Sequence, residues 1–151
     1  VRLYPHNFQN CERERFEQEC PGIDCYLGKK SMYKQLQESR LFIGNTNGTT
    51  YLEAFTANNP SLIFWNPDHW EIRASAQPYF DKLRSAGIFH DTPESAAELV
   101  NKIYNDPIAW WQQPQIQEAK DQFCHQFART SERWLKEWKE EILGLESKWR
   151  K

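Results

Sequence analysis

The sequence predicts an α/β fold with a mostly parallel sheet of about five strands, helices on both faces and a helical C-terminal extension. Short apolar runs alternate with longer amphipathic stretches, which is the pattern of consecutive βαβ units. Crossovers between parallel strands are right-handed, and this places helices over the sheet. The alternation stops after Asp106-Pro107, beyond which the pattern is helical and rich in Trp. We therefore expect a sheet domain over residues 1–106 and a helical extension over 107–151 that packs on it.

Five apolar runs are short enough to be strands, and they end at turn residues such as Pro5 and Gly28. They cover residues 1–4, 23–27, 41–44, 61–65 and 87–90. The run 41–44 is expected to be a short buried strand, and 61–65 is the most apolar of the five.

The stretches between these runs have helical spacing. The predicted helices cover residues 11–20, 31–39, 50–58, 70–86 and a segment from 93 onward. Pro21-Gly22 ends the first helix, and Pro78 is expected to break or bend the fourth. Thr92 is the predicted N-cap of the last, with Pro93 at its first helical position.

Composition favours a globular protein without a nucleic-acid or membrane-spanning role. The 151 residues are 39% hydrophobic and 26% charged, enough for one domain with a core. The formal net charge of −2 gives no basic field for nucleic acid. No apolar run approaches the roughly 20 residues of a transmembrane helix. We expect a cytoplasmic protein, at most peripheral to the inner membrane. The start at Val1, in strand-like sequence without Met, leads us to expect a missing N-terminal domain.

Cysteine and histidine spacing does not suggest a metal site. The four cysteines are Cys11, Cys20, Cys25 and Cys124, and the four histidines are His6, His69, His90 and His125. None forms a CxxC, HxH or HExxH pattern. We expect reduced thiols and no metal, with a disulfide or a metal as the less favoured alternative.

Ligands bind at the carboxyl ends of the strands in an open parallel sheet. Four predicted loops lie there, and they hold the polar residues able to bind a ligand. They cover residues 5–7, 45–50, 66–70 and 90–95. The loops expected at the opposite edge, Pro21-Gly22 and Asn59-Pro60, are plain turns.

The segment Asn47-Gly48-Thr49-Thr50 is the strongest candidate for a phosphate site. Glycine lets a backbone approach a ligand closely, and the start of the next helix favours an anion. The two Thr hydroxyls add donors. A capping box of Thr50 and Glu53 explains those two residues without any ligand, so both interpretations stay open. The segment is not a P-loop, because the GKS/T ending is absent.

Charged residues near the first strand are further candidates. His6 follows that strand beside the same predicted crevice, and Arg2 could pair with a phosphate. Arg73 could do so as well, although a surface role suits it better.

The segment Asn66 to Glu71 is a candidate for the sugar or acceptor side. Asp68 or His69 could act as a base, and Trp70 offers an aromatic surface. The structural alternative is a loop packed by Trp70, with Asp68 capping the next helix. No Ser/His/Asp, Cys/His or paired-carboxylate pattern is present, so the catalytic residues stay unassigned.

The C-terminal segment predicts an amphipathic helix, with Trp134, Trp138, Ile142 and Leu145 at helical spacing. We expect its apolar face to dock on the domain's own sheet or on the missing domain. A membrane-surface helix is the less favoured alternative.

Several longer stretches match a known family of sequences. The landmarks are Arg2-Leu3-Tyr4-Pro5, Asn47-Gly48-Thr49-Thr50, Phe64-Trp65-Asn66-Pro67, His69-Trp70-Glu71, Pro78-Tyr79-Phe80, Gly87-Ile88-Phe89-His90 and Thr92-Pro93-Glu94-Ser95-Ala96-Ala97. With them, most of the chain resembles the C-terminal, donor-binding half of GT-B glycosyltransferases. It more closely resembles bacterial transferases of surface-polysaccharide (lipopolysaccharide O-antigen) gene clusters.

A weaker resemblance is to bacterial sialyltransferases and to polymerases that transfer glycerol phosphate from a CDP donor. Those enzymes carry a His-Pro element after one strand and paired Ser/Thr residues at a helix start. Thr49-Thr50 matches the second element in type and place, whereas Pro5-His6 reverses the order of the first. Glu53 matches the acidic residue that GT-B enzymes place in the helix after the glycine-rich loop.

The resemblance implies a Rossmann-like domain that binds a nucleotide-sugar as substrate, with no separate cofactor. It also implies that the acceptor and the catalytic base come from the N-terminal domain. GT-B enzymes generally need no bound metal, because helix dipoles and side chains stabilise the departing diphosphate.

Two other functions stay open at this point. A non-catalytic α/β module would bind a protein partner through its Trp-rich helices, with Trp110, Trp111, Trp134 and Trp138 in an interface rather than a core. A different enzyme with a phosphoryl donor could also use this fold, because a fold does not determine a function.

Overall fold

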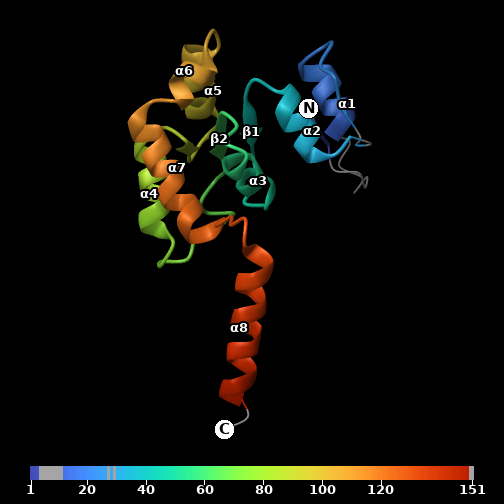
Figure 1. Cartoon of the computed structure of the whole chain (residues 1–151). Helices are drawn as coiled ribbons and strands as arrows, with labels where there is room; N and C mark the ends of the chain where they lie inside the picture. The colour runs from blue at the N-terminus through green and yellow to red at the C-terminus, as the bar shows by residue number, and fades with distance from the viewer. Residues whose placement is uncertain (4–11, 27, 29, 150–151) are drawn as a thin grey trace. The chain divides into compact units, whose positions relative to one another are not determined.

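The computed structural model describes residues 1–3, 12–26, 28 and 30–149, with the side chains of 146–149 excepted (Figure 1). The chain divides into two compact units, Val1–Ser39 and Arg40–Lys151. Each unit has its own local structure, and the second contains the sheet.

The first unit contains two short helices, α1 (Glu12–Glu19) and α2 (Met32–Glu38), close to their predicted ranges. No residue of α1 is buried. Helix α2 begins after Ser31, whose Oγ accepts a hydrogen bond from the amide of Lys34 at 3.3 Å. Leu36 of α2 is buried, which provides this unit with part of its apolar core.

The two strands predicted in this unit form one isolated bridge among their described residues. Arg2 and Tyr26 form an isolated parallel bridge, with the Leu3 amide donating to the Tyr26 carbonyl at 3.0 Å. The prediction of about five strands was therefore wrong for the described residues, in which one sheet has three strands. Asp24 interrupts the second run, and Asp is depleted in strands because it fits a pleated, half-buried surface poorly.

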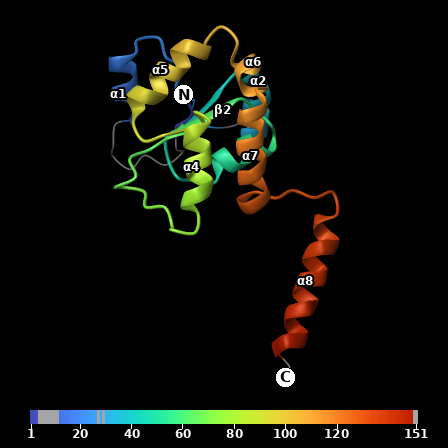
Figure 2. The same ribbon diagram turned by 90° about the vertical axis from the view of Figure 1, so that its left-hand side faces the viewer.

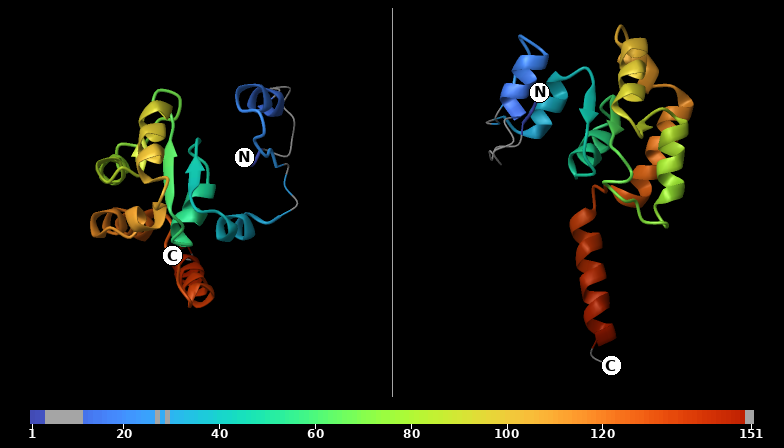
Figure 3. Two further views of the ribbon diagram at one scale, coloured as in Figure 1. Left: turned by 90° about the horizontal axis from the view of Figure 1, so that it is seen from above. Right: turned by 180° about the vertical axis from the view of Figure 1, so that it is seen from behind.

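The second unit is built on a parallel sheet of β1 (Phe42–Gly44), β2 (Ser61–Phe64) and β3 (Phe89–His90), in the order β1-β2-β3. Figure 3 shows β1 and β2 as parallel arrows, with Ile43 opposite Leu62 in the register. The predicted α/β class is confirmed.

Burial follows the position of each strand in the sheet. The first three residues of the central strand β2 are buried, which explains its continuous apolar sequence. Strand β1 lies at the edge and is only half-buried, with 48% of Ile43 exposed. The prediction of a buried strand at 41–44 was wrong, because among the described residues β1 pairs only with β2 and its other edge is open.

Helices of the second unit follow the strands closely. They are α3 (Thr50–Thr56), α4 (Gln77–Ser85), α5 (Pro93–Ile103), α6 (Pro107–Trp111), α7 (Pro114–Phe127) and α8 (Trp134–Trp149). Helix α4 begins at residue 77 rather than 70, and Pro78 lies in its first turn, where no amide donor is required. The prediction that Pro78 breaks or bends a helix over residues 70–86 was therefore wrong, because the helix begins just before Pro78. Thr92 caps α5 as predicted, accepting from the Ser95 amide at 3.2 Å.

Helix α7 links α3 and α4 through aromatic contacts. Figure 2 shows α4 and α7 side by side. The ring of Phe123 lies 5.9 Å from that of Phe55 in α3 and 5.0 Å from that of Phe80 in α4, both edge-on. Edge-to-face geometry is favourable for aromatic rings and adds to the gain from burying them.

A polar junction attaches α6 and α7 to the turn after α3. The indole nitrogen of Trp111 donates to Asn58 O (3.1 Å) and Oδ1 (3.0 Å), and Lys120 Nζ donates to Asn58 Oδ1 at 3.1 Å. Lys120 is 7% exposed and also pairs with Asp121 at 2.7 Å. Asn58 has φ = 52°, a left-handed conformation that Asn tolerates better than most residues.

Trp110 and Trp111 are buried in this core. A protein-binding module was predicted to use Trp110, Trp111, Trp134 and Trp138 in its interface. Because Trp110 and Trp111 are buried, two of these four residues do not lie on the surface.

The junction predicts the stability order of variants at Asn58. Asn58→Gly keeps the left-handed turn and the backbone carbonyl that accepts from Trp111, but it removes the Oδ1 acceptor that Trp111 and Lys120 share, and we expect a loss of about 1 kcal/mol. Asn58→Ala should lose roughly a further 1 kcal/mol, because Ala is strained in that conformation. Asn58→Asp retains the acceptor and serves as the control. Urea unfolding followed by Trp fluorescence measures all three, and a wild-type midpoint for Asn58→Gly would contradict this role.

Candidate functional site

Parallel pairing brings the carboxyl ends of β1, β2 and β3 to one edge of the sheet. The loops that leave this edge cover residues 45–49, 65–76 and 91–92. The predicted donor segment and the predicted sugar or acceptor segment both lie in these loops. They are therefore neighbours at one edge of the second unit.

The β1–α3 loop is anchored to the core through Tyr51. The phenol of Tyr51 donates a hydrogen bond to Asn47 Oδ1 at 3.3 Å, and this side chain is 6% exposed. Burial raises the pKa of Tyr51 to about 12, so the phenol stays protonated and remains a donor at physiological pH. Sequence analysis missed Tyr51; its signal is an apolar-face aromatic four residues after Asn47.

The predicted capping box does not form at the start of α3. The N-cap is Thr49, with φ = −82° and ψ = −15°, and no side chain caps the helix. Thr50 is already the first helical residue, so it lies outside the extended N-cap geometry that the box requires. The prediction that Thr50 and Glu53 cap each other was wrong. Within the described part of the chain, the exposed Thr49 and Thr50 hydroxyls form no hydrogen bond.

Gly48 lies in a position where glycine is not required for folding. A Cβ built there would meet Thr46 Oγ1 at 3.6 Å, which is ordinary van der Waals contact. Gly44 in β1 is different, because a Cβ there would lie 3.0 Å from Phe42 Cε1 and 3.3 Å from Ile63 Cγ2. Packing thus explains why position 44 requires a glycine. At position 48 packing does not require one, and the close approach of a ligand to the backbone would explain it.

The β2–α4 loop begins with a turn closed by Asn66. Its Oδ1 accepts from the Asp68 amide at 2.9 Å, and its carbonyl accepts from the amides of His69 (3.0 Å) and Trp70 (3.1 Å). This local bonding is typical of an Asx turn. The side chains of Asp68, His69 and Glu71 are exposed.

The structural alternative proposed for this loop was wrong in both parts. Asp68 does not cap the next helix, because α4 begins at Gln77 with Ala76 as its N-cap. Trp70 does not pack the loop, since 45% of it is exposed.

Trp65, the first residue after β2, is buried among aromatic rings at this edge of the sheet. It is 3% exposed, and its ring lies 5.9 Å from Tyr51, 5.8 Å from Phe80 and 4.6 Å from Phe89. Its indole nitrogen has no hydrogen-bond partner among the described residues, an omission that costs about 1–3 kcal/mol in a buried site. The sequence analysis placed Trp65 in the strand 61–65 and among the landmarks of the resemblance, but gave it no role at the site.

The third loop is stabilised by internal bonds. His90 Nε2 donates to the Gly87 carbonyl at 3.0 Å, and its Nδ1 lies 3.1 Å from Ser95 Oγ, in the tautomer that this network favours. Arg84 binds both carboxylate oxygens of Asp91, at 2.8 and 2.9 Å. These side chains already form hydrogen bonds or ion pairs within the protein. The segment 90–95 therefore has fewer unpaired polar groups for a ligand than the other two loops.

Two further residues were predicted to contact the phosphates, and the structure does not place either relative to these loops. His6 is not among the described residues. Arg2 belongs to the first unit, where its Nη1 donates to the Lys30 carbonyl at 3.2 Å and to Gln35 Oε1. A role for either residue at the donor stays a prediction.

Among the residues with described placement, no group of three or more His, Cys, Asp or Glu could hold a metal ion. Cys20, Cys25 and Cys124 are free thiols, and Cys11 is not described. No helix in the described ranges is long and apolar enough to cross a membrane.

His90 predicts an acid-sensitive contribution to stability. Burial lowers the pKa of its imidazole below the usual value of about 6.5, so the unfolded chain binds a proton more readily than the folded one. This contribution is fully present above about pH 6.5 and is lost as the pH falls towards the folded pKa. His90→Gln should therefore reduce the decrease in melting temperature between neutral and mildly acidic pH. The melting temperatures of the wild type and of His90→Gln at alkaline pH serve as the reference. If the two proteins then lose the same number of degrees on acidification, His90 does not make this contribution.

Comparisons with known proteins identify the family of the chain. Neither the curated proteins nor the solved structures contain a match to it. The family model described as LIC12162 family transferase matches residues 1–142, which is most of the chain. The chain therefore belongs to the LIC12162 family of transferases.

Proposed function

We propose that this chain binds a nucleotide-activated sugar at the β1–α3 loop and acts in the transfer of that sugar to a surface-polysaccharide acceptor. Membership of a transferase family supports group transfer as the reaction class. One observation carries the proposal. The hydroxyls of Thr49 and Thr50 are exposed at the carboxyl edge of a parallel sheet, and neither of them caps helix α3.

The donor's diphosphate would lie against Gly48, Thr49 and Thr50. Their backbone amides and the two hydroxyls are hydrogen-bond donors suited to phosphate oxygens. The anchored Asn47 offers its side-chain amide beside them. Glu53, exposed on the first turn of α3, would accept a hydrogen bond from a ribose or sugar hydroxyl.

The sugar or acceptor would lie beside the β2–α4 loop. Trp70 is the most suitable surface there, because its indole is 45% exposed and an aromatic face packs well on a sugar ring. The exposed Asp68, His69 and Glu71 side chains can accept hydrogen bonds from hydroxyl groups. Asn66 is engaged through its Oδ1 in the turn, which leaves its amide nitrogen as a donor.

The remaining parts of the reaction come from outside this loop cluster. Arg2 and His6 would flank the phosphates, and an N-terminal domain of the same protein would supply the acceptor site and the catalytic base. The chain by itself is then expected to bind donor and to turn it over slowly. Full transfer activity from this chain alone would contradict that division of labour.

One observation favours the second candidate function, a protein-binding module. Trp134 and Trp138 are 59% and 65% exposed on α8, as such a module requires. Because the chain belongs to a transferase family, this surface would accompany a transferase activity rather than replace it.

The proposed donor site predicts nucleotide-dependent stabilisation. The UDP, GDP, CDP, CMP and dTDP series, with their sugars, are tested by thermal shift on this chain and on Thr49→Ala/Thr50→Ala. A ligand at 100 times its dissociation constant adds about 2.7 kcal/mol of apparent stability. We expect stabilisation by one nucleotide series that disappears in the double variant. If no series stabilises either this chain or the full-length protein, the proposal is wrong.

Gly48 gives a sharper test, because it separates binding from folding. Gly48→Ala introduces a methyl group that the loop accommodates, so unfolding in urea should be unchanged or slightly harder. The same methyl group should obstruct a phosphate lying against the backbone and weaken nucleotide binding. Gly44→Ala is the matched control, expected to destabilise the protein because Phe42 and Ile63 must move. Unimpaired nucleotide binding by Gly48→Ala would remove the loop from the donor site.

A further inference from the structure

Helix α8 leaves its apolar residues exposed. Trp134, Trp138, Ile142 and Leu145 are 59%, 65%, 56% and 51% exposed. No other described element of its unit covers them, in contrast to the buried face of α7. Docking of this face on the chain's own sheet, the first alternative from sequence, is therefore not what the structure shows.

A hollow is formed by the segment after α7 and the first two turns of α8. It has a volume of about 350 Å³ and is lined by Arg129, Ser131, Trp134, Glu137, Trp138 and Glu141. Binding sites for small molecules range from about 300 to 1,000 Å³, so the hollow is large enough for a small ligand. None of its residues belongs to the loops at the carboxyl edge of the sheet, and a ligand here would be separate from the proposed donor.

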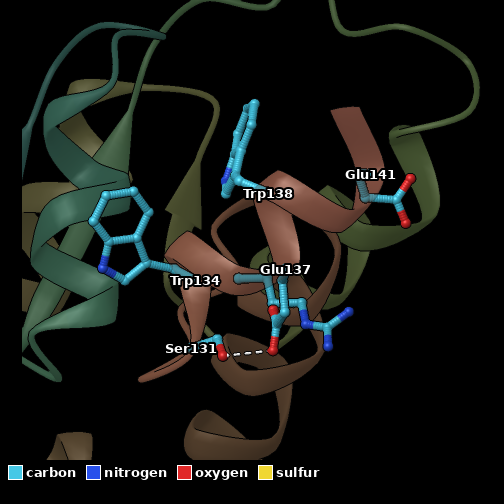
Figure 4. A pocket seen from close by; sticks show the side chains of 6 residues that line it. Ser131, Trp134, Glu137, Trp138 and Glu141 are labelled. Carbon is cyan, nitrogen blue, oxygen red and sulfur yellow. Dashed lines mark hydrogen bonds between the residues drawn. The ribbon is translucent and has the colours of Figure 1, made fainter. Parts of the chain in front are cut away.

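Two indoles and two carboxylates share one face of α8. Trp134 and Trp138 are four residues apart, as are Glu137 and Glu141. Residues three or four apart are neighbours on the surface of a helix, so the acidic side chains lie directly beside the aromatic ones. Figure 4 shows these four side chains, all of which line the hollow.

Within the described part of the chain, the carboxylates of Glu137 and Glu141 form no ion pair, and neither does the guanidinium of Arg129. Ser131 Oγ donates a hydrogen bond to Glu137 Oε1 at 2.8 Å, drawn as a dashed line in Figure 4. The Ser131 carbonyl in turn accepts from the Trp134 amide at 3.2 Å. These bonds fix Glu137 in place and leave its charge intact. The lining therefore has two negative charges and one positive charge.

This combination favours a ligand with a positive charge. The face of an indole attracts a cation more strongly than the rings of Tyr or Phe do, at up to about 6 Å from the ring centre. Carboxylates beside the rings add a second attraction. An apolar surface fits poorly, because covering the two indoles with it would also remove Glu137 and Glu141 from water without a partner.

We propose that the hollow is a binding site for a small organic cation that carries an alkylammonium group. The carbon atoms next to the charged nitrogen pack on the indole faces of Trp134 and Trp138, and the charge lies beside Glu137 and Glu141. The hydrogen bond from Ser131 holds one carboxylate in position before the ligand arrives, which lowers the entropic cost of binding. Both indoles are more than half exposed, so the binding is weak.

Choline tests the proposal against its neutral isostere, 3,3-dimethylbutan-1-ol, in which a carbon atom replaces the charged nitrogen. Both compounds are titrated into the whole chain at constant ionic strength, and the indole N–H signals are followed by NMR. Trp134→Leu and Trp138→Leu assign the two signals concerned. We expect choline to shift both signals and to bind at least about tenfold more tightly than the alcohol. Equal binding of the two compounds, or no shift with choline, overturns the proposal.

Charge removal tests the acidic side of the hollow. Glu141→Gln keeps the size of the side chain and removes its charge, so choline should bind several-fold more weakly. Glu140→Gln is the matched control, because Glu140 pairs with Lys136 (3.7 Å) on the opposite side of α8. Far-ultraviolet circular dichroism checks that both variants keep the helix. Equal effects of the two substitutions on choline binding contradict the proposed site.

Phospholipid vesicles identify the source of the ammonium group. Choline binding without binding to phosphatidylcholine vesicles would indicate a free solute. Binding to these vesicles that free choline reverses would indicate the lipid headgroup. Both results support the site. Equal binding to phosphatidylcholine and phosphatidylglycerol vesicles, with no effect of choline, would assign α8 to an apolar membrane contact and overturn the proposal.

Discussion

Parallel pairing of β2 with both of its neighbours is the constraint on which the rest of the second unit depends. Because β2 is central, its residues Ser61, Leu62 and Ile63 are buried, and helices must cover the sheet around them. Three strands are a small surface for that purpose, and α6 and α7 complete the core with Trp111 and Phe123. The same pairing brings the loops after all three strands to one edge, so the packing requirement and the placement of the candidate site have a common origin.

The candidate site is fixed in position, because its polar loops rest on buried aromatic rings. The ring of Tyr51 packs in the core against Trp65, and its hydroxyl donates a hydrogen bond to Asn47 in the β1–α3 loop. Burial raises the pKa of that phenol and keeps it protonated, so the anchor holds across the physiological pH range. The hydroxyls of Thr49 and Thr50 are exposed above this support and need no rearrangement of the core to receive a ligand. Preorganisation of this kind lowers the entropic cost of binding.

The sequence was informative where one local rule acted alone and misleading where two rules competed. The apolar run 61–65 and the Thr92-Pro93 helix start follow from burial and capping chemistry. Residues 61–64 of that run form β2, and Thr92 caps α5 as predicted. The pattern T-x-x-E at Thr50 satisfies a capping rule, but the chain turns into helical geometry one residue earlier, so the rule does not apply. The run 23–27 was predicted as a strand, and its described residues form only one bridge, between Tyr26 and Arg2. The contacts of Tyr51 and Trp65 beneath the loops depend on the three-dimensional packing of α3 against β2, which no single segment encodes.

Helices α7 and α8 show why amphipathic spacing identifies an apolar face but not what covers it. In α7, Ile116, Ala119, Lys120 and Phe123 are buried, a broad stripe that includes a charged residue satisfied by Asn58. Such a wide face suits irregular packing against several elements of one domain. In α8, the apolar residues remain exposed and are not confined to one narrow stripe. They are Trp134, Leu135, Trp138, Ile142, Leu143 and Leu145. The same helical periodicity therefore predicts an apolar face in both helices, and only the contacts within the folded unit distinguish the buried face of α7 from the exposed face of α8.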